Sequence, residues 1–343
     1  MTDNESMKAL PDKQPKFKLN NGQEIPALAL GTWKAEAGEV ERAVENAVRL
    51  GIRHIDTAEM YGNQDEIGNA LAKLMKEGVV KREDVWITSK LHNKSHARVR
   101  EACQETLKQL RADYLDAYLM HWPISTDDKL NPIEGPPIED TYHEMEALVD
   151  AGMVRSIGVS NFSVKKLRAL LKEVRIKPQI QQIEGHIYFR NEYNMHYCSV
   201  HGIHVTSYSP FGSPDSASMS GRRVNIAYPL HDPMVVGIAE KLKKHPAQVL
   251  LRWHTQRGSS TAFKAATPEH IQSNLEALAF ELPPEDMRAL TTIAYTMRFV
   301  DGEKWWVRED GPIKTLTDLW DGEELTGWPP GVSTYSWLSS DKI

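Results

Sequence analysis

The chain has 343 residues, of which 41% are hydrophobic and 26% charged, as is typical of a globular protein with a large core. The net charge of −6 and the lack of long lysine and arginine runs argue against nucleic acid or an anionic membrane as partner, so we expect a small-molecule partner. Cys103 and Cys198 are the two cysteines, too few for a disulfide framework in a chain of this length. We therefore expect free thiols and a reducing compartment.

Residues 1–15 are polar and lack the apolar core of a signal peptide, so we expect a flexible N-terminal segment and a cytoplasmic protein. No stretch of about 18 apolar residues occurs, and we expect no membrane span. The ordered fold is predicted to begin at residue 16. There, Asn21-Gly22 lies between two short alternating runs, which is the commonest signal of a two-residue β-hairpin turn.

From residue 27 onward, short apolar runs alternate with amphipathic ones. The apolar runs predict strands over 27–33, 54–58, 85–90, 114–122, 156–161, 180–186, 204–209 and 261–265. The amphipathic runs predict helices over 39–50, 65–76, 97–110, 139–151, 164–174, 192–201, 233–243 and 269–275. One more helix is predicted over 284–295, followed by an irregular tail over about 296–343. Five of the nine tryptophans lie in this tail: Trp305, Trp306, Trp320, Trp328 and Trp337.

Eight strand-helix units predict parallel strands, because each helical crossover returns the chain to the same edge of the sheet. We expect a single domain over 16–343: a (β/α)8 TIM barrel with an N-terminal β-hairpin and a long C-terminal tail. The rival is an open doubly wound sheet, which in a dinucleotide enzyme carries G-x-G-x-x-G after its first strand. Here the first strand ends in Gly31-Thr32-Trp33, and the pattern is absent.

Polar residues at strand ends carry the functional information, because the active site of a (β/α)8 barrel lies at the carboxyl ends of its strands. Asp56, Lys90 and His121 end three consecutive predicted strands, and Tyr61 follows the first of them. Taken singly, these are ordinary residues: a helix N-cap, a solvated lysine, a core histidine and a packed aromatic. Together they form an acid-base unit, in which a lysine ammonium lowers the pKa of a tyrosine and a carboxylate keeps the lysine charged.

Four motifs resemble the aldo-keto reductase superfamily, nearest its aldose/aldehyde reductase branch. They are Gly31-Thr-Trp-Lys34, His54-Ile-Asp-Thr-Ala-Glu-Met-Tyr61-Gly-Asn63, Ile157-Gly-Val-Ser-Asn-Phe162 and Val205-Thr-Ser-Tyr-Ser-Pro-Phe-Gly-Ser-Pro214. The similarity extends from about residue 17 to 282, with the motifs in the family's order and spacing. It implies reduction of a carbonyl compound to an alcohol with a nicotinamide cofactor and without a metal.

The resemblance assigns the catalytic roles to Asp56, Tyr61, Lys90 and His121. The reduced nicotinamide delivers hydride to the carbonyl carbon, while Tyr61 donates a proton to the oxygen. Lys90, paired with Asp56, lowers the pKa of Tyr61. His121 hydrogen-bonds the carbonyl and so also contacts the substrate.

The resemblance also implies a cofactor lying across the top of the barrel. Ser160, Asn161 and Gln182 match positions that bind the nicotinamide carboxamide, and Tyr208 matches the aromatic that stacks on the ring. The segment 212–230 resembles the loop that folds over the dinucleotide, although as plain sequence it reads as a flexible linker. The further cofactor positions are Gly31, Thr32, Trp33, Asp56, Ser209, Phe211, Ser213, Lys264, Ala265, Thr267, His270, Ser273 and Asn274.

The adenosine-phosphate motif departs from the family pattern of Ile-Pro-Lys-Ser followed by Thr-Pro-Glu-Arg. Lys264 remains available for a 2′-phosphate, but Ala265 replaces the serine and His270 replaces the arginine. A guanidinium offers a permanent bidentate charge, which an imidazole near neutral pH does not. We expect NADPH as the cofactor and leave NADH open.

The sequence indicates the substrate less clearly than the cofactor. Trp33 and Trp122 match aromatic walls of the family's substrate pocket, with barrel-rim packing as the alternative. His92 reads as a solvated loop histidine or as a residue at the mouth. The tryptophan-rich tail either closes the pocket or clamps the outside of the barrel. Candidate substrates are aldoses, aliphatic and aromatic aldehydes, and ketones.

Three functions compete. The first is the NADPH-dependent reductase, and the presence of all four catalytic residues favours it. The second is a cofactor-binding regulatory or structural barrel without turnover. The third is an unrelated phosphate-handling barrel, such as an aldolase with a Schiff-base lysine at Lys90. We expect a monomer, because no heptad or other assembly signature is visible.

Overall fold

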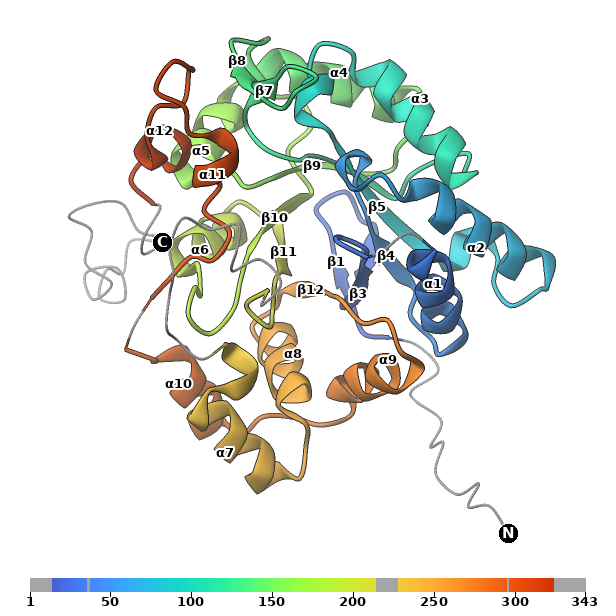
Figure 1. Ribbon diagram of the computed structural model, residues 1–343, viewed down its shortest axis with the longest axis vertical. Coiled ribbons are helices and arrows are strands. Elements are labelled where there is room, and N and C mark those ends of the chain that lie inside the picture. The colour runs from blue at the N-terminus through green and yellow to red at the C-terminus, as the bar shows by residue number, and fades with distance from the viewer. Residues whose placement is uncertain (1–13, 36–37, 214–227, 295, 324–343) are drawn as a thin grey trace.

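Eight parallel strands close into a barrel at the centre of the computed structural model, which describes residues 14–35, 38–213, 228–294 and 296–323 (Figure 1). The strands pair in chain order, and the last pairs with the first. They are β3 (Leu28–Gly31), β4 (His54–Asp56), β5 (Trp86–Leu91), β6 (Ala117–Met120), β9 (Ile157–Ser160), β10 (Ile180–Glu184), β11 (His204–Tyr208) and β12 (Ser260–Phe263). The predicted (β/α)8 barrel is confirmed.

Helices surround the barrel, and those next to it lie close to the predicted ranges except α8, which was not predicted (Figure 1). They are α1 (Glu39–Arg49), α2 (Gln64–Lys76), α3 (Val99–Leu110), α4 (Ile138–Asp150), α5 (Val164–Glu173), α6 (Glu192–Val200), α8 (Pro246–Gln256) and α9 (Pro268–Leu275). α1 shows why the apolar pattern predicted the helices: Val40, Val44 and Ala47 recur at helical spacing and are buried against the core. Short 3-10 helices occupy Glu59–Tyr61, Arg82–Asp84, Asn93–Ser95, Pro229–His231 and Glu276–Ala279.

An antiparallel hairpin of β1 (Lys16–Lys18) and β2 (Glu24–Pro26) covers the amino-terminal end of the barrel. Leu19 and Ile25 pack there against Trp86 and Leu119. The hairpin is confirmed, but its turn is longer than the two residues predicted. The Leu19 N–H donates to the Gln23 carbonyl at 2.8 Å, which leaves three residues in the turn, with Gly22 at a φ of 85°.

Two α-helices, not the single one predicted, lie between β11 and β12 in the residues that the structure describes. α8 packs against β12, whereas α7 (Pro233–Leu242) lies farther out and contacts α10 (Pro284–Thr291). α8 escaped prediction because polar residues, among them His254, lie on its buried face and interrupt the apolar pattern. The start of α8 could have been predicted, since its capping residue, His245, directly precedes a proline.

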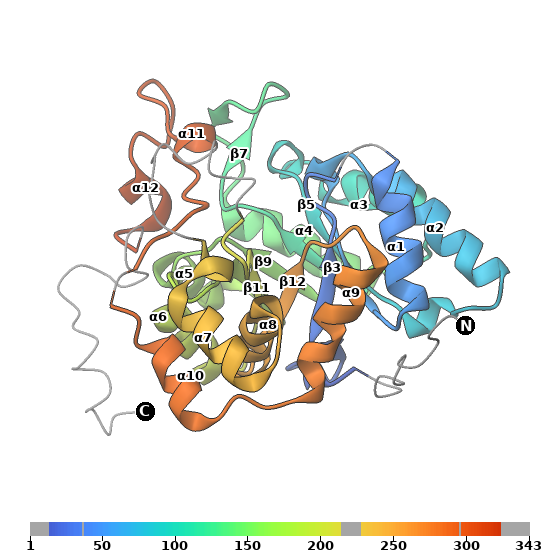
Figure 2. The ribbon, with the colours of Figure 1, turned by 60° about the horizontal axis from the view of Figure 1, so that its bottom comes forward.

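Three short elements stand over the carboxyl end of the barrel. A hairpin of β7 (Ser125–Thr126) and β8 (Pro132–Ile133) belongs to the connection from β6 to α4, while α11 (Glu303–Trp306) and α12 (Leu316–Trp320) belong to the tail. Figure 2 shows β7, α11 and α12 on the same side of the barrel. The mouth is therefore built from segments far apart in the sequence.

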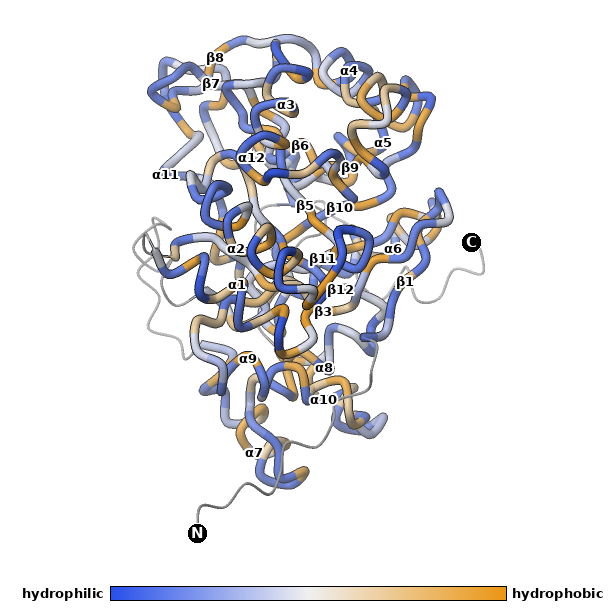
Figure 3. The backbone as a smooth tube through the Cα atoms, turned by 90° about the vertical axis from the view of Figure 1, so that its right-hand side faces the viewer, coloured by the Kyte–Doolittle hydropathy of each residue, from blue (hydrophilic) through white to orange (hydrophobic). Residues whose placement is uncertain are grey.

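Apolar residues concentrate in the barrel strands, as Figure 3 shows for β3, β11 and β12. Leu28, Leu30, Ile55 and Ile87 are almost completely buried. Parallel strands covered on both faces read as short continuous apolar runs, and their alternation with amphipathic runs located them. In the described ranges, no helix has both the length and the apolarity that a membrane crossing requires.

Gly158 on β9 is predicted to tolerate no side chain. A Cβ there would lie 2.3 Å from the Ile180 carbonyl oxygen and 2.8 Å from Leu119 Cδ2. We expect Gly158→Ala to lower the free energy of unfolding by about 1–3 kcal/mol, measured by urea denaturation, because backbone cannot yield to the new methyl group.

Gly237→Ala is the matched control, because Gly237 is an exposed residue of α7 with nothing within 4 Å of its Cβ position. It should stabilise the protein slightly, by up to about 1 kcal/mol. Equal effects of the two alanines would contradict the close approach of β9 and β10.

Candidate active site

The four predicted catalytic residues meet at the carboxyl end of three neighbouring strands. Asp56 ends β4, Lys90 lies in β5, and His121 directly follows β6. Tyr61 ends the 3-10 helix Glu59–Tyr61 that follows β4. Asp56 is not a helix N-cap, because α2 begins only at Gln64.

Lys90 is completely buried and forms an ion pair with Asp56. Its Nζ lies 2.7 Å from Asp56 Oδ1 and donates to the Thr57 carbonyl at 2.8 Å. Burial lowers the pKa of Lys90, and the Asp56 carboxylate opposes that effect. The carboxylate thus holds the ammonium in place beneath the mouth, as expected.

The pKa of Tyr61 departs from the expectation. Burial raises it well above its ordinary value, and the charge of Asp56 raises it further. We expected Lys90 to lower this pKa. However, the ammonium is turned toward Asp56 and Thr57, 5.2 Å from the centre of the Tyr61 ring, so its charge is largely compensated before it reaches the phenol. Tyr61 is therefore a neutral phenol at physiological pH.

His121 lies edge-on to Tyr61, with 5.7 Å between the ring centres. Burial lowers the pKa of His121 well below its ordinary value, and the positive charge of Lys90 lowers it further. The imidazole is therefore neutral and carries one N–H to donate. Within the described part of the chain, its buried Nδ1 has no hydrogen-bond partner.

Glu59 and Asn63 fix the turn that carries Tyr61, and sequence reasoning assigned neither a role. Glu59 accepts hydrogen bonds from the His92 N–H at 3.1 Å and the Ser95 hydroxyl at 3.0 Å. Asn63 donates to the Thr32 carbonyl at 2.8 Å. The signal was visible, since both lie within the motif that contains Asp56 and Tyr61.

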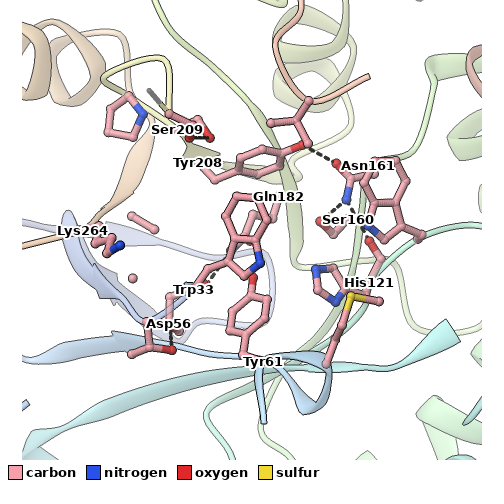
Figure 4. Close-up of a pocket in the computed structure, with 18 of the residues that line it drawn as sticks. Trp33, Asp56, Tyr61, His121, Ser160, Asn161, Gln182, Tyr208, Ser209 and Lys264 are labelled. Carbon is pink, nitrogen blue, oxygen red and sulfur yellow. Dashed lines mark hydrogen bonds between the residues drawn. The ribbon is translucent and has the colours of Figure 1, made fainter. Parts of the chain in front are cut away.

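The residues predicted to bind a carboxamide lie across the mouth from Tyr61 (Figure 4). The Tyr208 hydroxyl donates to Asn161 Oδ1 at 2.7 Å, and Asn161 Nδ2 donates to the His121 carbonyl at 2.9 Å. Asn161 has a φ of 62°, the left-handed region in which asparagine is favoured. Gln182 donates its Nε2 hydrogen to Asp56 Oδ2 at 2.7 Å.

A single pocket brings together most of the predicted cofactor positions. Its lining includes Gly31, Thr32, Trp33, Asp56, Ser160, Asn161, Gln182, Tyr208, Ser209, Phe211, Ser213 and Lys264. It also includes Pro210, Ala262 and Phe263, which were not predicted. Lys90 is not part of the lining, because it lies beneath the surface of the pocket.

The remaining predicted positions lie at and just before α9, beyond the pocket. They are Ala265, Thr267, His270, Ser273 and Asn274. Thr267 caps the helix and accepts the His270 N–H at 3.3 Å. Lys264 donates to the Lys34 carbonyl at 2.9 Å, between the pocket and the α9 N-terminus. Most of the predicted covering loop over 212–230 falls outside the described residues.

Aromatic and aliphatic side chains form the outer wall of the pocket. Trp33 and Trp122 line it, as predicted, and Trp305 from the tail packs edge-on against both, at 6.2 and 6.5 Å between ring centres. Met60, Leu130, Val300 and Trp306 complete the wall. His92 is neither solvated nor part of the lining: it is buried, and its Nδ1 accepts the Lys94 N–H at 3.2 Å.

The start of the tail is anchored to the barrel by a buried carboxylate. Glu184, at the end of β10, accepts the backbone N–H groups of Phe299 at 2.6 Å and Val300 at 3.0 Å. Next to them, the guanidinium of Arg298 stacks on Trp320 at 3.5 Å from the ring centre. These contacts place Val300 and the residues that follow at the edge of the pocket.

The end of the described tail is attached to the N-terminus of α5. Glu323 accepts the Val164 N–H at 3.0 Å, while Asp321 accepts the Ser163 hydroxyl and the Lys166 ammonium, each at 2.6 Å. Carboxylates at a helix N-terminus are favoured by the helix dipole. The tail thus both closes the pocket and clamps the outside of the barrel. Trp328 and Trp337 fall outside the described residues.

In the part of the chain that the structure describes, no three or more His, Cys, Asp or Glu side chains are grouped so as to hold a metal ion. The metal-free reaction implied by the resemblance remains a prediction.

Comparisons with known proteins agree with this geometry. Residues 27–294 match the family model of the aldo/keto reductase family. An aldo/keto reductase of Synechocystis is 40% identical over 89% of this chain and 96% of its own length. Aldo-keto reductase family 4 member C11 of Arabidopsis thaliana is 41% identical over 90% and 98%.

Solved structures agree as well. The aldose reductase of Schistosoma japonicum has a TM-score of 0.76 and 39% identity, covering 87% of this chain and all of its own. The Bombyx mori aldo-keto reductase, solved in complex with NADP, has a TM-score of 0.80 and 34% identity, covering 88% of this chain and 98% of its own.

The attachment of the tail to α5 can be tested by hydrogen exchange. We expect Asp321→Asn to speed amide exchange at Trp305 and Trp306 by about tenfold, because a partly buried ion pair that holds the tail is lost. Asp150→Asn is the control, since its ion pair with Arg175 is exposed and contributes little. Equal exchange in both variants would show that Asp321 does not hold the wall in place.

Proposed function

This chain belongs to the aldo-keto reductase family, and on that premise we propose that it is an NADPH-dependent reductase that converts aldehydes to alcohols. The observation that carries the proposal is the buried Asp56–Lys90 pair, which lies beneath a neutral tyrosine and a neutral histidine. Tyr61 and His121 both line one pocket together with the carboxamide-binding positions.

The residues present fit a nicotinamide dinucleotide. Ser160, Asn161 and Gln182 offer amide and hydroxyl groups beside Tyr208, whose ring stacks on the nicotinamide in our proposal. At the other end, Lys264 and the N-terminus of α9 offer positive charge to the adenosine phosphates. The family uses NADP(H). When bound, the reduced cofactor supplies the hydride that adds to the carbonyl carbon.

Tyr61 acts as the proton donor in this proposal. A general acid must hold its proton until the carbonyl oxygen gains negative charge, and the raised pKa of Tyr61 ensures that it does. The ammonium of Lys90 lies 5.2 Å from the centre of the ring, and the part of its charge that Asp56 does not compensate favours the charge that develops on the phenol as the proton leaves. Neutral His121 donates its N–H to the same oxygen and fixes the direction in which the carbonyl points.

The wall of the pocket favours an apolar substrate over a sugar. Around Tyr61 and His121 the lining consists of tryptophans with Met60, Leu130 and Val300. The hydroxyl groups of an aldose would lose their water there and find few partners, at a cost of about 1–3 kcal/mol for each unpaired group. We therefore propose aromatic and longer aliphatic aldehydes as the preferred substrates, with aldoses and ketones as weaker ones.

The competing functions have less support. A Schiff-base enzyme needs its lysine amine exposed to substrate and uncharged, whereas Lys90 is buried and paired with Asp56. A regulatory or structural barrel has no need of all four catalytic residues. We further propose a cytoplasmic monomer, on the composition and the lack of an assembly motif.

We expect Tyr61→Phe to lower kcat for aldehyde reduction by about 100-fold or more, because it removes the proton donor and leaves the shape of the pocket unchanged. The measurement is the loss of NADPH absorbance with a nitrobenzaldehyde, an aliphatic aldehyde and xylose.

Tyr142→Phe is the matched control. Tyr142 is fully buried on α4, away from the pocket, and in the described chain its hydroxyl has no hydrogen-bond partner. This variant should retain wild-type activity. Full activity of Tyr61→Phe would overturn the assignment of the acid, and an inactive wild type that still binds cofactor would favour the regulatory barrel.

We expect NADPH to be preferred over NADH, and Lys264→Met to weaken NADPH binding by about 10-fold while leaving NADH unchanged. The reason is that only NADPH carries the 2′-phosphate with which Lys264 forms a charge-assisted hydrogen bond. Tryptophan fluorescence quenching measures both affinities. NADH binding and turnover equal to those of NADPH would contradict the proposed cofactor, given that Ala265 and His270 already depart from the family pattern.

A further inference from the structure

The side chain of Gln182 reaches across the inside of the barrel to a catalytic residue. Gln182 Nε2 donates to Asp56 Oδ2 at 2.7 Å, and Lys90 Nζ donates to the other oxygen, Asp56 Oδ1, at 2.7 Å. Strands β10, β4 and β5 are thus joined through one carboxylate. Figure 4 shows Gln182 between Asp56 and the other two predicted carboxamide-binding residues, Ser160 and Asn161.

We propose that Gln182 is a positioning residue that couples the bound nicotinamide carboxamide to the Asp56–Lys90 pair. Through this coupling it sets how much negative charge the Asp56 carboxylate presents to Tyr61. This inference rests on the proposed function, since it requires that a nicotinamide binds at this mouth.

The chemistry of the glutamine amide gives the coupling its direction. One of its two N–H donors is committed to Asp56, and its amide oxygen is the group that can accept from the carboxamide NH2 of the cofactor. Hydrogen bonds in such a chain polarise one another, and they do so most strongly where water is excluded. Asp56 is 4% exposed and Gln182 is 2% exposed, so the chain lies out of water.

Ser160 differs from Gln182 in this respect, although both are predicted to contact the carboxamide. Its hydroxyl accepts a hydrogen bond from Asn161 Nδ2 at 3.2 Å, and Asn161 in turn contacts His121 and Tyr208. No hydrogen bond between Ser160 and Asp56 is seen in the described residues. Ser160 therefore serves as the matched comparison.

Few charged or titratable groups face Asp56 besides Lys90. The charge of Asp56 adds to the effect of burial in raising the pKa of Tyr61, and it opposes the effect of burial on the pKa of His54. Burial lowers the pKa of His54 to about 4, so His54 is neutral above that pH. His121 faces the pair from the side of Lys90 and is neutral as well.

Removing the donor of Gln182 should therefore act on Tyr61 through Asp56 alone. An Asp56 carboxylate that loses one of its two side-chain donors keeps more negative charge near the phenol, which raises the pKa of Tyr61.

A double-mutant cycle on cofactor binding tests the coupling without turnover. NADPH dissociation constants are measured by fluorescence quenching for Gln182→Met and Ser160→Ala, each in the wild-type and in the Asp56→Asn background. We expect Gln182→Met to weaken binding about 10-fold in the wild type but only about 2-fold with Asp56→Asn, because coupled residues are not additive. Ser160→Ala should weaken binding by the same factor in both backgrounds.

The pH dependence of kcat gives a second readout. We expect Gln182→Met to move the alkaline limb of aldehyde reduction to higher pH, and Ser160→Ala to leave it in place. Equal effects of Gln182→Met in both backgrounds, or an unmoved alkaline limb, would overturn the coupling and leave Gln182 as a simple cofactor ligand.

Two safeguards keep the test decisive. If Asp56→Asn does not fold because Lys90 loses its partner, Asp56→Asn combined with Lys90→Met removes both charges and serves as the background. The proposed function can fail independently of this inference. Wild-type protein that binds NADPH but reduces no aldehyde would refute the reductase function, whereas the double-mutant cycle on NADPH binding would still measure the coupling of Gln182 to Asp56.

Discussion

A lysine ammonium with no exposed surface is the constraint on which the rest of this site depends. Removing a charge from water costs several kcal/mol, and only close partners in fixed positions compensate for that cost. Asp56 and the Thr57 carbonyl are these partners for Lys90. The parallel register of β4 and β5, which places Asp56 beside Thr88, brings both partners within hydrogen-bond distance of the Lys90 ammonium. The closed barrel is therefore what makes a permanently oriented cation available beneath Tyr61.

Burial and the charged pair together keep the neighbouring side chains neutral. Burial lowers the pKa of His121, and the charge of Lys90 lowers it further, while burial and the charge of Asp56 raise the pKa of Tyr61. Sequence reasoning placed these residues together because each follows or ends a strand. It misjudged the pKa of Tyr61, since the spacing of residues along a chain does not show which way an ammonium points or how deeply a phenol is buried.

Much of the fold was predictable for a related reason. Strands buried on both faces give short continuous apolar runs, whereas helices buried on one face give an apolar period, and this difference located every barrel strand and most of the helices. α8 was not predicted because Gln248 and His254 lie on its buried face, and these polar residues interrupt the apolar period of the helix. The wall residues Leu130 and Trp305 were not assigned because their positions depend on packing between distant segments.

The tail that supplies Val300, Trp305 and Trp306 follows the last strand-helix unit, and its hydrogen bonds to the barrel include those at Glu184 and at the start of α5. None of these contacts involves the Asp56–Lys90 pair. A substitution in the tail can therefore change which molecules fit without disturbing the proton donor. Such a division lets selectivity diverge rapidly between duplicated genes while the reaction itself is preserved, and it offers the tail as the segment to randomise when a new substrate is sought.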